Sequence, residues 1–177
     1  MLRLTMMTGT LCIALMTSSG FAQVPADPSN PNEAVPAEMN PPAYGEPINI
    51  AAAKKVAAAA TAELTKRNWH GMCISVVDPH GDLVYFKRDD SFQYASIAIS
   101  QHKARTAARY RRPTVVFERL LGKGNFFAYL TTLDDVIMSR GGNPLIVDGK
   151  VVGAIGVSGG TGSQDDIISQ AGVAGLN

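Results

Sequence analysis

A basic stretch over residues 100–112 contains the side chains best suited to binding or catalysis. It carries five Lys and Arg residues and one His, and it contains no acidic residue. In a helix, His102, Thr106 and Arg109 would share one stripe because they are spaced i, i+4 and i+7. Arg105 would lie beside this stripe. Arginine side chains pair with planar oxyanions, so the stripe predicts a face that binds carboxylate or propionate groups. A solvated face that pairs with surface acids is the alternative.

Two glycine-rich turns, at 139–144 and 153–166, form a second group of candidates. Glycines let backbone amides approach a ligand closely, and a glycine-rich turn before a helix can bind an anion. The tight end of a hairpin is the alternative interpretation. The pattern is neither a P-loop nor Gly-x-Ser-x-Gly. The candidate ligand contacts in these turns are Gly141, Gly142, Ser158, Gly159 and Gly160.

The same stretches could support general acid–base catalysis without a metal. His102 or Asp165 could act as the base, and Tyr110 as an acid. Arg105 or Lys103 could then hold an anionic intermediate. The sequence shows no Cys/His or paired-carboxylate constellation of the kind that binds a metal ion, so no metal site is predicted.

The elements that must position these residues follow a simple order: helix, hairpin, helices, hairpin, helix. Strands joined by tight turns are antiparallel, and Asp148-Gly149 is a pair that favours such a turn. The sequence therefore predicts one α+β domain over residues 47–177, in which helices flank an antiparallel sheet. The helices are expected at 48–67, 93–111, 114–121 and 165–174, and the strands at 72–77, 83–86, 145–147 and 151–157.

The first 46 residues are predicted to lie outside this domain. Arg3, a short apolar stretch at 11–16 and the small residues around Ala22 are typical of a cleavable signal peptide over residues 1–22. The apolar stretch is too short to span a bilayer. Residues 23–46 contain six of the ten prolines and are predicted to form a flexible arm. We therefore expect a periplasmic or secreted protein.

Charge argues against two classes of partner. The chain has 16 basic and 15 acidic residues, and cleavage after Ala22 would remove one basic residue, Arg3, leaving 15 of each. A neutral chain has no field suited to coating nucleic acid or an anionic membrane. We expect neither partner for the mature protein.

Three segments carry a resemblance to a known family. The helix segment 102–107, the Gly-Gly-x-Pro step at 141–144, and the segment 147–165 are similar to the GlcG/HbpS haem-binding-protein-like family. That family also resembles the C-terminal domain of PduO-type cobalamin adenosyltransferases. The resemblance covers about Ile48 to the end of the chain. It implies a five-stranded antiparallel sheet flanked by helices, assembly into homo-oligomers, and pockets near subunit contacts.

The resemblance also bears on which cofactor the protein could bind. Some members bind haem or corrinoid-related ligands, and the haem-binding members take an axial His from the N-terminal helix region. Residues 48–67 contain no His. His70 and His80 are expected at the surface, so His102 is the candidate from a matched motif. The sequence does not identify the cofactor, and haem is the group that the resemblance implies.

Together these observations predict an exported, oligomeric protein that binds a small ligand. The ligand would be haem or another planar molecule that carries carboxylates or an aromatic ring. The alternative is a metal-free lyase or isomerase acting on a small aromatic compound. We expect the pocket between the 102–109 face and the glycine turns, and we expect Ala104, Ala107 and Ala108 to provide a slim face for close packing.

Overall fold

The computed structural model describes residues 40–176 of the 177-residue chain. The chain divides into two units, 1–40 and 41–177, and the second contains all of the described helices and strands. The predicted signal peptide and most of the predicted arm, up to residue 39, lie outside the described residues.

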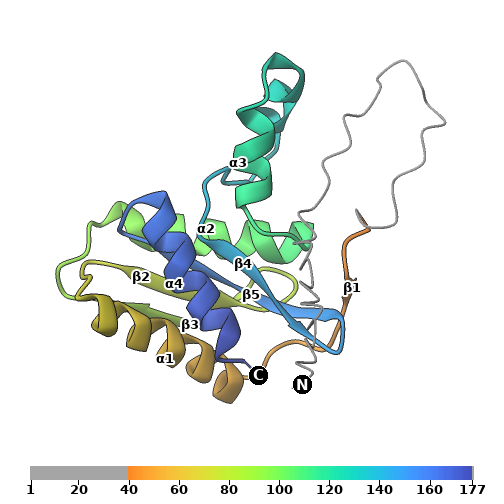
Figure 1. The fold of residues 1–177 in the computed structure, drawn as a ribbon. Helices are drawn as coiled ribbons and strands as arrows, with labels where there is room; N and C mark the ends of the chain where they lie inside the picture. The colour runs from red at the N-terminus through yellow and green to blue at the C-terminus, as the bar shows by residue number, and fades with distance from the viewer. Residues whose placement is uncertain (1–39, 177) are drawn as a thin grey trace, which may run out of the picture. The chain divides into compact units, whose positions relative to one another are not determined.

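The described residues contain the predicted elements in the predicted order, with a short strand and a 3-10 helix in addition (Figure 1). Asn49 caps the first helix, since its side chain accepts a hydrogen bond from the Ala52 amide. A 3-10 helix, η2, occupies the connection after the third helix. The helices are α1 (Ile50–Arg67), α2 (Ala95–Tyr110), α3 (Val115–Leu121), η2 (Asn125–Thr132) and α4 (Gly162–Ala174). The strands are β1 (Ala43–Tyr44), β2 (Cys73–Val77), β3 (Leu83–Arg88), β4 (Gly142–Val147) and β5 (Lys150–Ser158).

The five strands form one mixed sheet. Strands β1, β5, β2 and β3 follow one another in that order, and β4 pairs with β5 as well. The pairs β2–β3 and β4–β5 are antiparallel, as predicted from their tight turns. The pair β2–β5, which no turn joins, is antiparallel as well. Strand β1 was not predicted, and it runs parallel to β5. The single domain, the flanking helices and the five strands agree with the predicted fold class.

Strand β1 falls within the segment predicted as a flexible arm. The Gly45 amide donates to the Val151 carbonyl at 2.8 Å, which extends the pairing with β5. The Tyr44 hydroxyl donates to the Arg109 carbonyl at 2.6 Å, and the Arg111 guanidinium lies 4.9 Å from the centre of the Tyr44 ring. These contacts attach the last residues of the arm to the domain. Proline content alone did not reveal them, because they depend on residues far along the chain.

The helices cover both faces of the sheet. Helices α1 and α4 pack on the face that carries Ile74 and Ile155. Helix α2 packs on the other face, where Ala104, Ala107 and Ala108 are fully buried against Val77 and Ala154. The slim alanine face predicted from the sequence therefore serves packing within the chain. No helix within residues 40–176 combines the length and the apolar character needed to cross a membrane.

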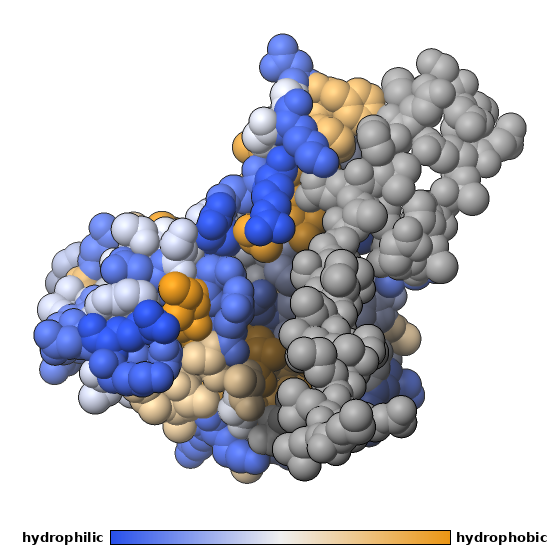
Figure 2. Space-filling model, viewed as in Figure 1, coloured by the Kyte–Doolittle hydropathy of each residue, from blue (hydrophilic) through white to orange (hydrophobic). Residues whose placement is uncertain are grey.

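Helix α3 and η2 project from this body (Figure 1). They pack against each other, and the projection carries the exposed side chains of Leu121, Phe126 and Tyr129. Figure 2 shows hydrophobic residues along it. Arg140, just before β4, links the chain that leads back to the sheet with α3. The Arg140 amide and Nε atom each donate to the Glu118 carboxylate at 2.8 Å.

Candidate functional site

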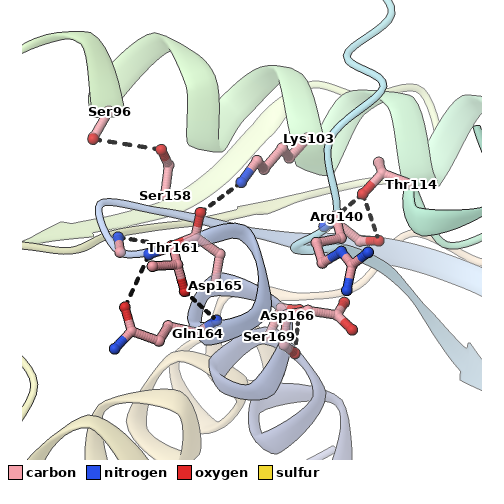
Figure 3. A network of polar contacts seen from close by, with 12 residues as sticks. Ser96, Lys103, Thr114, Arg140, Ser158, Thr161, Gln164, Asp165, Asp166 and Ser169 are labelled. Carbon is pink, nitrogen blue, oxygen red and sulfur yellow. Dashed lines mark hydrogen bonds and ion pairs between the residues drawn. The ribbon is translucent and has the colours of Figure 1, made fainter. Parts of the chain in front are cut away.

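Two of the predicted catalytic residues, Lys103 and Asp165, form a buried ion pair. Lys103 extends from α2, and Asp165 lies in the first turn of α4 on the opposite face of the sheet (Figure 3). The Lys103 Nζ atom lies 2.7 Å from Asp165 Oδ2, and the two side chains are 2% and 4% exposed. A substrate has no access to either group in this arrangement. The pair instead connects the two helix layers.

The second glycine turn is anchored to the same carboxylate. The Gly160 amide donates to Asp165 Oδ1 at 2.9 Å. Thr161 then caps α4 in a capping box. The Gln164 amide donates to the Thr161 hydroxyl, and the Thr161 amide donates to the Gln164 side-chain oxygen. Gly159 has a φ of 143°, which favours glycine. In this structure the turn therefore holds the protein's own Asp165 carboxylate through the Gly160 amide.

Burial raises the pKa of Asp165 above its ordinary value. The Lys103 ammonium and the amides of Gly160 and Gly159 act in the opposite direction, because they stabilise the carboxylate. A buried carboxylate needs such partners, since its charge has lost its hydration.

The first glycine turn lies against this ion pair. Gly141 has a φ of 110°, and a Cβ atom built on it would lie 2.8 Å from Asp165 Cβ and 3.1 Å from Lys103 Nζ. At Gly142 a Cβ would lie 2.3 Å from the Lys103 carbonyl oxygen. At Gly156 it would lie 2.0 Å from the Ser100 carbonyl oxygen. The backbone of α2 occupies the space beside Gly142 and Gly156, so these glycines permit close packing of the helix on the sheet.

Three further candidates on α2 form a partly exposed cluster. His102, Arg105 and Arg109 converge on one carboxylate, that of Asp135. Arg105 Nη1 donates to Asp135 Oδ1 and Arg109 Nη1 to Asp135 Oδ2, both at 2.9 Å. His102 Nε2 lies 3.6 Å from Asp135 Oδ1, and the His102 side chain is 42% exposed. In this structure the three basic side chains thus pair with an exposed acid of the chain itself, which is the arrangement that the alternative interpretation of this face predicts.

Backbone carbonyls fix the direction of the two arginines. Arg109 Nε donates to the His80 carbonyl at 2.8 Å, and Arg105 Nε lies 3.4 Å from the Gly81 carbonyl. Both acceptors belong to the turn between β2 and β3. This turn places the guanidinium groups in front of Asp135, which itself adopts a φ of 58°.

Three further candidates lie away from this cluster. Thr106 is buried, and its hydroxyl accepts a hydrogen bond from the Ile137 amide at 3.0 Å. Tyr110 packs edge-on against the Phe117 ring, with the ring centres 5.2 Å apart. Ser158 is buried and donates to the Ser96 hydroxyl at 3.4 Å. Each of them joins elements of the fold in this structure.

A cavity of about 380 Å³ opens between the C-terminal end of α1 and strand β3. Leu64, Met72 and Ile74 form its apolar wall, and Trp69 and Lys87 also line it. Sequence reasoning missed this site, although the run Asn68-Trp69-His70 at the end of a predicted helix was a usable signal. Among residues 40–176, no group of three or more His, Cys, Asp and Glu side chains is arranged to hold a metal ion.

Comparison with known proteins agrees with this architecture. A family model described as "Haem degrading protein HbpS-like" matches residues 48–174. Protein GlcG of Escherichia coli (strain K12) is 39% identical over 106 residues, which cover 60% of this chain and 77% of GlcG. The crystal structure of HbpS is similar with a TM-score of 0.69 and 27% identity, covering 82% of this chain and 99% of HbpS.

The haem complex of PduOC has the same fold, with a TM-score of 0.67 and 23% identity over 74% of this chain and 96% of PduOC. The resemblance predicted from the helix segment and the glycine turns is confirmed. Since the family model spans nearly the whole described unit, the chain belongs to the HbpS-like family.

Proposed function

We propose that this protein is an exported, oligomeric binding protein for a small planar ligand that carries carboxylate groups. The observation that carries the proposal is the convergence of His102, Arg105 and Arg109 on the single carboxylate of Asp135. Such a cluster recognises carboxylates, because guanidinium groups offer paired N–H donors in a fixed plane.

A ligand carboxylate can compete for this place. Asp135 and its neighbour Asp134 are exposed, and Asp135 enters the cluster from the segment between η2 and β4 rather than from the sheet. Exposed ion pairs contribute little individually, about 0.2–1 kcal/mol. A ligand carboxylate could therefore displace Asp135 at a small cost in free energy. Because Asp135 is exposed, this displacement requires no change in the core.

Haem satisfies this chemistry, and two comparisons support it as a candidate. The matching family model describes a haem-degrading protein, and PduOC, which shares the fold, was solved with haem. The donor set fits the group: Arg105 and Arg109 would pair with its propionates, and His102 offers an imidazole nitrogen beside them. Helix α1 contributes no His, which distinguishes this chain from members that take an axial His there.

Titration of the purified protein with hemin tests the proposal. Binding should produce a Soret band, and Arg105→Gln and Arg109→Gln should each weaken binding roughly tenfold, as expected for loss of a charge-assisted hydrogen bond. Arg119→Gln, at an exposed position on α3, is the matched control. If both cluster variants bind hemin as tightly as the parent, the cluster is not the binding site.

Export and assembly need separate measurements. Intact mass of the protein recovered from the producing cell should correspond to a chain that begins near Gln23. Light scattering at tens of micromolar should give a mass above that of a single chain. A retained leader would contradict export with cleavage, and a monomer would contradict the oligomer.

A further inference from the structure

We infer that the cavity between α1 and β3 is a second binding site, which takes an aromatic carboxylate. Its volume of about 380 Å³ falls in the range of small-molecule sites. It lies on the face of the sheet covered by α1, whereas the His102–Arg109 cluster lies on α2, which covers the other face. The inference therefore does not rest on the proposed function.

The wall of the cavity suits an aromatic ring. Leu64 of α1, Met72 just before β2 and Ile74 of β2 are buried and line the cavity with apolar surface. Trp69 is half-buried against the same core, and the Arg67 guanidinium lies 5.0 Å from its ring centre. The indole lines the cavity, and an aromatic ring gains stacking contacts with indole beyond simple burial.

Two cationic side chains, Lys87 and Arg88, line the cavity, and we assign the ligand contact to Lys87. In the β2–β3 register Lys87 lies opposite Ile74, so its side chain points to the face of the sheet that α1 covers. Lys87 Nζ donates to the Thr61 hydroxyl at 3.0 Å, and within residues 40–176 no carboxylate lies within 4 Å of it. Arg88 lies opposite Cys73, and its guanidinium lies 4.5 Å from the centre of the Phe92 ring.

Two acidic residues, Asp89 and Asp90, line the cavity and must be weighed against an anionic ligand. Asp90 is exposed, and Asp89 is the more enclosed of the two. Its carboxylate accepts hydrogen bonds at 2.8 Å from the amides of Gly71 and Asp90, and His70 Nδ1 lies 3.9 Å from it. The amide of Gly71 is the main cause of a lowered pKa of Asp89, and the charges of His70 and Lys87 contribute less. These donors offset the carboxylate charge locally, and Lys87 keeps two of its three donors for a ligand.

The sequence contains one Trp, so the cavity has its own reporter. The indole N–H signal of Trp69 in ¹H–¹⁵N NMR spectra can be followed during titration with 2-naphthoate and with its neutral analogue 2-naphthamide. We expect a saturable shift with 2-naphthoate and at least roughly tenfold weaker binding of the amide, as for loss of a charge-assisted contact.

Variants separate the ring contact from the charge contact. Lys87→Met keeps the apolar stem and removes the charge, so it should weaken 2-naphthoate binding roughly tenfold and leave 2-naphthamide unchanged. Lys123→Met, at an exposed position after α3, should bind both probes like the parent. An unshifted indole signal, equal affinity for the two probes, or unchanged 2-naphthoate binding in Lys87→Met would each overturn the inference. Arg105→Gln should leave this titration unaffected.

Discussion

The Lys103 ammonium lies 2.7 Å from the Asp165 carboxylate, and this ion pair joins two helices that cover opposite faces of the sheet. The ion pair lies at the end of the sheet where β4 begins, just after Gly141, and where β5 ends, just before Gly159. A side chain at Gly141 would meet both partners of the pair. The two glycine turns and the ion pair are therefore one structural unit.

Replacing Lys103 by Met should destabilise the fold by about 3–5 kcal/mol, because it leaves the buried Asp165 charge without its partner. Chemical denaturation at neutral pH measures this loss. Lys123→Met, which removes an exposed lysine, should stay within about 0.5 kcal/mol of the parent. The double variant Lys103→Met with Asp165→Leu should recover part of the lost stability. Equal stability of Lys103→Met and the parent would rule out a structural role for the pair.

Gly156→Ala should be destabilising by about 1–3 kcal/mol or more. The added Cβ would lie 2.0 Å from the Ser100 carbonyl oxygen and 2.4 Å from the Ala104 amide nitrogen, so α2 would have to move off the sheet. Gly122→Ala is the matched control, because its nearest neighbours lie at 3.6 Å. Thermal melts compare the two. A melting temperature for Gly156→Ala close to that of the control would show that α2 has room to shift.

The contribution of Glu118 to stability should depend on pH. Hydrogen bonds from Arg140 lower the pKa of Glu118 below its ordinary value of 4.5. The ionised form is thus favoured in the folded state, and its contribution is present above the unfolded pKa and lost as the pH falls through the folded pKa. Glu118→Gln should therefore be less stable than the parent at neutral pH, and the difference should shrink under acidic conditions. Urea denaturation at about pH 7 and about pH 3.5 measures it. A difference that stays constant between the two would exclude this linkage.

Asp135→Asn should strengthen hemin binding roughly two- to tenfold if ligand carboxylates replace Asp135 in the cluster. The amide keeps the shape of the side chain and removes the charge that competes for Arg105 and Arg109. Asp134→Asn, at the exposed neighbouring position, is the control and should bind like the parent. Absorption titration gives both affinities. Weaker binding in Asp135→Asn would mean that Asp135 organises the site rather than occupies it.

The fold could be predicted from local signals. The Asp148-Gly149 turn, for example, acts within a few residues, and the hairpin that it predicted is present. Strand β1 escaped prediction because two residues carry no periodicity. Their pairing with β5 depends on a partner more than a hundred residues away.

The chemistry of the site was decided by tertiary structure. The sequence by itself determined which residue types are present: a basic helix without acids, and two turns rich in glycine. It could not determine their partners, because Asp135 and Asp165 reach α2 from segments 26 to 62 residues away. Lys103 and its neighbour His102 also have different environments, since Lys103 is buried and the His102 side chain is 42% exposed. Consecutive helical residues point about 100° apart, so only one of the two faces the core.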